Sequence, residues 1–204
     1  MKRSQRYGDA GQAFPIYITV VGGLLFLALA YFAVGQATVN RSGAQTAADA
    51  AALAAAQDRR DQLAGEWVKD VLDPSKWQDI FEGNSLGLRP SCSRAYELAQ
   101  KNDAHVLECG ADGPLTFTVR VETNNAMGKS VVPITESTHS TAPATAVIKA
   151  LCTFDAEAAE GGADALPGLA CKHRRWDLDP KDLADLPKPQ DLFDVHLADR
   201  QAND

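Results

Sequence analysis

Residues 13–34 read AFPIYITVVGGLLFLALAYFAV, a stretch of 22 residues without a charged side chain. A helix of this length spans about 33 Å at ~1.5 Å per residue, which matches the ~30 Å hydrocarbon core of a bilayer. Pro15 falls in the first turn, where its missing N–H costs little. Tyr17 and Tyr31 lie near the two ends, where amphipathic aromatic side chains prefer the membrane interface. The stretch therefore predicts a single transmembrane helix.

The residues before this helix indicate its orientation. Lys2, Arg3 and Arg6 are opposed by one acid, Asp9. Because basic flanks stay in the cytoplasm, residues 1–12 are predicted to be a cytoplasmic leader and the chain after the helix is predicted to lie outside. The predicted location is thus the cell membrane, with a single pass and an extracytoplasmic C-terminal part.

Two kinds of processing remain as alternatives to a retained leader and helix. Signal peptidase would cut after Ala37, although the apolar stretch exceeds the 7–15 residues of a signal core. A prepilin-type peptidase would cut between Gly11 and Gln12, because Gly11 directly precedes the apolar run after a short basic leader. Ile16 stands where substrates of that peptidase usually carry a glutamate.

The helical pattern continues beyond the membrane. Residues 35–72 contain no proline, and nine of the thirteen residues 44–56, AQTAADAAALAAA, are alanine. Alanine has the highest intrinsic helix propensity, so one helix is expected over residues 13–72, ending before Asp73-Pro74 and with a bend at Gly35 or Gly43 as an option. Small residues at spacings of three and four suit close packing between helices. The residues predicted to pack against neighbouring helices are Gly22, Gly23, Ala47, Ala48, Ala51 and Ala52. For Asp49 two interpretations stand: a solvated position, or a contact that sets the register with a neighbouring subunit.

This region resembles the N-terminal segment of Tad-type (tight adherence, Flp) pilus-assembly proteins, the TadE/TadG-like family. The resemblance covers about residues 8–57, and the matching positions are Arg41, Ala44, Gln45, Ala47, Ala48, Asp49, Ala50, Ala51, Ala52 and Leu53. It implies a structural or assembly component of a Tad/Flp pilus or a related secretion apparatus. The partners that it implies are the lipid bilayer and other pilus or pseudopilin subunits, including copies of the same chain. TadE-like members often carry a Val-Glu pair early in the span, where this chain has Phe14-Pro15-Ile16. The resemblance therefore gives less support to pilin-type polymerisation and correspondingly more to a membrane-retained, TadG-like accessory role.

The chain after residue 73 has the pattern of a small α+β head, residues 73–151. A loop-like stretch over 75–91 precedes a helix that starts near Cys92 and reaches Lys101. Strands are expected over 104–109, 115–122, 131–135 and 144–151, with a turn at 110–114. The strand 115–122 alternates apolar Leu115, Phe117, Val119 and Val121 with polar residues, so one face is predicted to be buried.

The four cysteines are predicted to form disulfides, because thiols outside the membrane pair by default. Cys92, Cys109, Cys152 and Cys171 allow three connectivities. The pairs Cys92–Cys109 and Cys152–Cys171 are favoured because each closes a short loop. The absence of Cys-x-x-Cys spacing argues against zinc.

Residues 152–204 contain twelve acids and six bases, and prolines interrupt any helix there. This composition predicts an acidic, partly flexible tail, for which docking on the head and disorder are both open. The whole chain carries a net charge of −7, which argues against nucleic acid as a partner.

Together these segments predict an α+β, membrane-anchored protein. A transmembrane helix (13–34) and an Ala-rich stalk helix (35–72) carry a pilin-like antiparallel head and the tail. No motif for catalysis, metal binding or a cofactor is present, so the chain is not expected to be an enzyme. The alternative function is a membrane-anchored extracytoplasmic binding module unrelated to pili.

Overall fold

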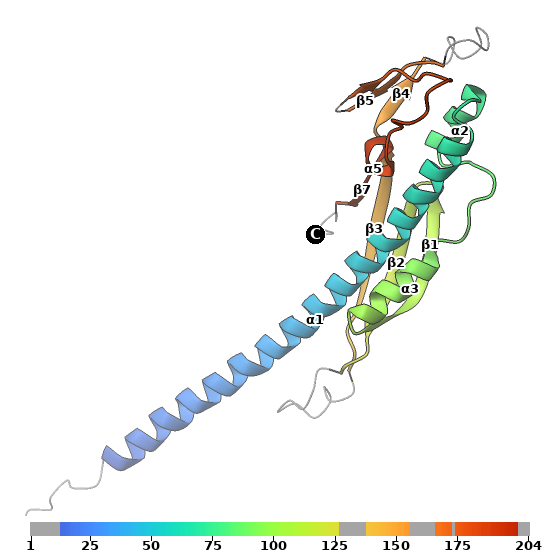
Figure 1. Cartoon of the computed structure of the whole chain (residues 1–204). Helices are drawn as coiled ribbons and strands as arrows, with labels where there is room; N and C mark the ends of the chain where they lie inside the picture. Colours follow the sequence, from blue (N-terminus) through green and yellow to red (C-terminus); the bar gives the residue numbers. More distant parts are fainter. Residues whose placement is uncertain (1–12, 127–137, 156–165, 173, 200–204) are drawn as a thin grey trace, which may run out of the picture.

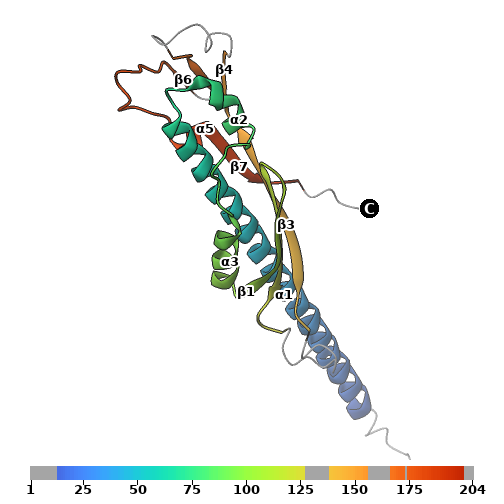
Figure 2. The ribbon, with the colours of Figure 1, turned by 90° about the vertical axis from the view of Figure 1, so that its right-hand side faces the viewer.

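One long helix, α1 (Ala13–Lys69), organises the computed structural model of the chain (Figure 1). The structure describes residues 13–126, 138–155, 166–172 and 174–199. The N-terminal half of α1 projects as a bare rod, while a head of strands and short helices lies along its C-terminal half (Figures 1 and 2). At ~1.5 Å per residue, the 57 residues of α1 extend about 86 Å.

The course of α1 follows its composition. No proline occurs in it after Pro15, and helical structure is continuous through Gly35 and Gly43. The predicted end at residue 72 lies three residues too late, because 70–72 form a turn before Asp73 and the 3-10 helix η1 (Pro74–Lys76). The most apolar 18-residue window of α1 has a mean hydropathy of 2.2, so this helix is long and apolar enough to cross a membrane.

Short helices and strands complete the head. The helices are α2 (Trp77–Phe81), α3 (Cys92–Lys101) and α5 (Pro189–Leu192). The strands are β1 (Ala104–Gly113), β2 (Thr116–Thr123), β3 (Thr141–Ala150), β4 (Cys152–Phe154), β5 (Leu169–Cys171), β6 (Arg175–Trp176) and β7 (Phe193–Leu197). They form a four-stranded antiparallel sheet of order β1-β2-β3-β7 and a small sheet of order β4-β5-β6. The α+β expectation is thereby confirmed.

The main sheet packs one face against α1, and its register explains how. Phe117, Val119 and Val121 of β2 are buried, as their alternation predicted. Each pairs with a buried alanine of β3, at positions 146, 144 and 142 respectively. Large side chains on one strand therefore lie beside small ones on the next, and α1 covers this surface.

Two local expectations were wrong. The turn expected at 110–114 lies instead at Pro114 and Leu115, because β1 continues through Gly110 to Gly113 opposite Thr116. The stretch 75–91 is not only loop, since it contains α2, whose residues Trp77, Ile80 and Phe81 are buried. The strand expected over 131–135 lies outside the described residues.

The described part of the acidic C-terminal segment is docked rather than free. β7 pairs with β3 and completes the main sheet at its edge. Leu192 and Phe193 are buried, and the Phe193 ring lies 5.4 Å from that of Phe81. This contact belongs to an aromatic cluster at the end of the head distant from the bare rod, which also contains Trp67, Trp77 and Phe154. Of the two alternatives for this segment, docking therefore holds for residues 166–172 and 174–199.

Both predicted disulfides are present. Cys92–Cys109 joins the first residue of α3 to β1, and Cys152–Cys171 joins directly paired positions of β4 and β5. The bonds close loops with sequence separations of 17 and 19. In the chain-entropy treatment, loops of this size stabilise the folded state by about 3 kcal/mol each.

Candidate functional site

The bare part of α1, residues 14–39 (the rod), carries most of the large apolar side chains that are exposed in the described chain. Its large side chains face outward, and Tyr31 and Val39 are 83% and 73% exposed. Soluble monomers rarely expose apolar surface on this scale, and each apolar Å² left in water forgoes roughly 25 cal/mol. A covering of lipid or of other protein would remove this apolar surface from water.

Gly22 and Gly23 lie in the middle of the rod and are exposed. A Cβ atom built on either would meet no atom of the described chain within 4 Å. The fold of a single copy therefore does not require glycine at these two positions. They remain candidates for close approach of another helix.

The four alanines predicted to pack against neighbouring subunits do not face outward. Ala47, Ala48, Ala51 and Ala52 are each 0% exposed and belong to the core shared by α1, the main sheet and α3. Their small side chains let the helix lie close to its own sheet. The intermolecular role predicted for them is thus corrected to a role inside the chain.

Asp49 is likewise engaged within its own chain. It is half-buried, and its Oδ1 accepts a hydrogen bond from Nε2 of Gln45, one helical turn earlier, at 2.6 Å. The same Nε2 lies 3.3 Å from the carbonyl oxygen of Pro143 in β3. Neither interpretation of Asp49, a solvated position or a contact with a neighbouring subunit, anticipated this bond. The pair Gln45 and Asp49, spaced by four residues, was the signal available in the sequence.

The place of Pro143 explains why this bond matters. β7 pairs with β3 only from Ala146 to Ala150, so residues 141–144 of β3 lie beyond the strand pairing on that side. The carbonyl of Thr145, two residues after Pro143, is directed to this edge, where it accepts from the backbone N–H of Ala198. Pro143 has no N–H to donate at this edge, and its carbonyl already accepts a hydrogen bond from Gln45. Pro143 and Gln45 together therefore protect the open sheet edge against pairing with another strand.

We expect Gln45→Ala to lower the free energy of unfolding by about 1 kcal/mol, because a half-buried hydrogen bond is lost and the Pro143 carbonyl loses its donor. Urea denaturation of the detergent-solubilised chain measures this change. Thr46→Ala is the control, since Thr46 is exposed and its hydroxyl donates to the Ser42 carbonyl of the same helix at 3.0 Å. Equal stability of the two variants would show that the Gln45 bond contributes nothing.

A half-buried cation that sequence analysis did not identify, Arg59, lies nearer the C-terminal end of α1. The guanidinium of Arg59 is stacked 5.3 Å from the centre of the Phe117 ring. Burial lowers the pKa of Arg59 from its usual value, and the charge of Asp58 opposes this shift. The Nε atom is buried without a hydrogen-bond partner among the described residues. The position holds a partly desolvated charge against the core.

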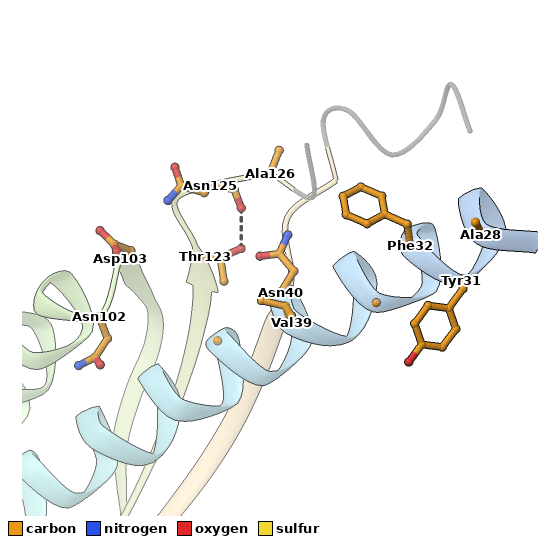
Figure 3. A pocket seen from close by; sticks show the side chains of 12 residues that line it. Ala28, Tyr31, Phe32, Val39, Asn40, Asn102, Asp103, Thr123, Asn125 and Ala126 are labelled. Atoms are coloured by element: carbon orange, nitrogen blue, oxygen red, sulfur yellow. Dashed lines mark hydrogen bonds between the residues drawn. The ribbon is translucent and has the colours of Figure 1, made fainter. Parts of the chain in front are cut away.

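A cleft of about 820 Å³, the junction cleft, opens where the rod meets the head. Its walls come from the rod and the next turns of α1, from the turn between α3 and β1, and from the end of β2. Figure 3 shows the polar side chains of the head at one end of the cleft, and Tyr31 and Phe32 at the other. The hydroxyl of Thr123 donates to the Asn125 carbonyl at 3.1 Å and holds the end of β2 in place.

The remaining predicted site residues are the four cysteines and the two residues of the predicted processing site. Cys92, Cys109, Cys152 and Cys171 are all disulfide-bonded. Gly11 and Gln12 lie outside the described residues. Within the described ranges, no group of three or more His, Cys, Asp or Glu side chains is arranged to hold a metal ion.

Comparison with protein families identifies the N-terminal segment. Residues 11–58 match the Tad family, described as "Putative Flp pilus-assembly TadE/G-like". The match confirms the resemblance found in the sequence and spans both the rod and the buried alanines. No curated protein and no solved structure matches the chain.

Proposed function

We propose that this chain, whose residues 11–58 form a TadE/G-like segment, is a structural or assembly component of a Tad/Flp-type pilus or a related secretion apparatus. The observation that carries the proposal is the division of the matched segment into two halves. One half is buried in the head of the same chain, and the other is an exposed apolar rod. A subunit of this shape can be held in a bilayer and can exchange lipid for neighbouring helices without refolding its head.

The proposed topology is a single pass with the head outside the cytoplasm. Residues 13–34 cross the bilayer, and the basic residues before them remain on the cytoplasmic side. The disulfides agree with this orientation, because such bonds persist in oxidising compartments.

Contact with other subunits is assigned to the rod. Since the predicted packing alanines at positions 47, 48, 51 and 52 of α1 are buried, Gly22 and Gly23 are the predicted packing residues that remain accessible. Glycine on an exposed helix face allows a second backbone to come close, which is the geometry that helices use inside membranes.

We expect the double change Gly22→Leu and Gly23→Leu to reduce recovery of pilus subunits with the tagged chain about tenfold, because the added side chains hold neighbouring helices apart. The measurement is quantitative mass spectrometry of proteins retained after mild detergent extraction from the native membrane. A tenfold loss corresponds to about 1.4 kcal/mol of association free energy. The head should stay folded, because both glycines are exposed and a Cβ atom at either meets no atom of the described chain within 4 Å.

Gly65→Leu is the matched control, since Gly65 is exposed on the part of α1 beside the head and also has open space around it. Undiminished recovery with the double variant would exclude rod packing through these glycines.

Replacing residues 1–37 by an unrelated single-pass anchor distinguishes a pilus component from a membrane-anchored binding module. Loss of pilus assembly is expected, whereas full assembly would favour a binding module for which the rod is only an anchor.

A further inference from the structure

We infer that the junction cleft binds one phospholipid of the outer leaflet, with an ammonium-bearing headgroup of the phosphatidylethanolamine class. The inference rests on the proposed membrane anchoring and adds a ligand to it. Its basis is the position of the cleft, the order of polarity along it and the sign of its charge.

The cleft lies across the predicted membrane surface. Ala28 and Phe32 line one end and belong to the last turns of the apolar stretch 13–34, at the depth of the upper acyl chains. Gly35 and Gly43 follow along the same helix as it leaves the bilayer. Figure 3 shows Phe32 directed to the side of the helix on which Asn125 and Ala126 lie. A lipid molecule beside the helix therefore meets apolar groups with its chains and the head with its polar end.

The helix leaves room for such a molecule. A Cβ atom built on Gly35 or Gly43 would meet no atom of the described residues within 4 Å, so both glycines contribute space to the cleft. A volume of about 820 Å³ exceeds what a headgroup with its glycerol and first methylenes needs.

The polar end selects the headgroup. Among the described residues that line the cleft, Asp103 alone carries a charge, and it is exposed. Its backbone is left-handed, with φ +52°, and its carbonyl accepts from the Asn124 N–H at 2.8 Å, which fixes the turn. The side-chain amides of Asn40 and Asn125 supply hydrogen-bond donors for a phosphate. One carboxylate with amide donors suits an ammonium and its phosphate better than an anionic headgroup.

The test reconstitutes the full-length chain in nanodiscs of equal parts phosphatidylethanolamine, phosphatidylglycerol and phosphatidylcholine. Native mass spectrometry then counts the lipids retained after mild activation. We expect phosphatidylethanolamine to be retained about threefold over phosphatidylglycerol, the size of an exposed charge pair, and also over phosphatidylcholine, whose methylated nitrogen has no N–H to donate to the Asp103 carboxylate. Asp103→Asn should remove this preference without straining the turn, because asparagine also tolerates positive φ. Gly43→Leu, which fills the cleft, should lower retention of all three lipids.

Two matched controls distinguish binding in the cleft from the general effect of removing an exposed acid or adding a leucine to α1. Asp112→Asn removes an exposed acid on β1 outside the cleft lining, and Gly65→Leu adds a leucine to α1 away from it; neither should change retention. Equal retention of the three lipids, selection of phosphatidylglycerol, or an unchanged preference in Asp103→Asn would overturn the inference and leave membrane anchoring intact. A chain that does not enter nanodiscs at all would contradict the anchoring and the inference with it.

Discussion

The double change Ala48→Leu and Ala52→Leu should lower the free energy of unfolding of the head by about 2 to 6 kcal/mol. Both alanines are 0% exposed against the main sheet and α3, and each leucine inserts three carbon atoms into a filled interior. Overpacking of this kind costs about 1 to 3 kcal/mol per site. Tryptophan fluorescence during urea denaturation of the detergent-solubilised chain reports the loss, because Trp67, Trp77 and Trp176 are all buried.

The control for this prediction is Ala50→Leu, on the half-buried side of the same helix turn. It should cost less than about 1 kcal/mol, because the longer side chain can extend along the groove between α1 and α3. A double variant with an unchanged unfolding midpoint and lost recovery of partner subunits would contradict the structure and restore the intermolecular role first predicted for these alanines. Loss of recovery together with an unfolded head would carry no information about an interface.

The alanines were predicted to pack against neighbouring subunits but pack inside their own chain, and the reason lies in what a sequence can reveal. Alanine propensity and the absence of proline are local properties, so the helix and its extent could be predicted to within three residues. Which surface covers the alanines is a long-range property. A stripe of small side chains fits a neighbouring helix and a sheet equally well, and the covering strand β3 begins about ninety residues later in the chain.

In the head, too, local features could be predicted from the sequence and long-range packing could not. The alternation in β2 and the short loops between cysteines are local signals, and both expectations were confirmed. The buried helix α2 was missed because Trp77, Ile80 and Phe81 stand among glycine, serine and asparagine, and the rings that cover them, such as Phe154 and Phe193, come from much later in the chain.

The candidate site was predictable in part. The exposed rod follows directly from its apolar composition, as does its match to a membrane in length. The bond from Gln45 to the Pro143 carbonyl could not be read from spacing, since it depends on where β7 stops along β3. The junction cleft depends likewise on two turns of the head meeting the helix at the level of Asn40.

Docking of the acidic C-terminal segment leads to the second large effect, that of Phe193→Ala. Phe193 is 1% exposed, begins β7 and packs against Phe81 at 5.4 Å. Truncating a buried phenylalanine costs about 3 to 5 kcal/mol. The carbonyl of the preceding Leu192 accepts from the Leu151 N–H, so loosening the ring also frees the junction of β3 with β4. We therefore expect β7 to detach before the rest of the head unfolds.

Hydrogen exchange resolves that expectation residue by residue. In β3 the Ile148 N–H is bonded to Leu115 on the β2 side, so backbone alternation directs the N–H groups of Val147 and Lys149 to β7. In Phe193→Ala these two amides should exchange at least tenfold faster, while Ile148 keeps its protection. Asp194→Ala, on the exposed face of β7, should leave all three unchanged. Equal acceleration at Ile148 would mean that the sheet opens as one unit and that the C-terminal segment is an integral part of the head.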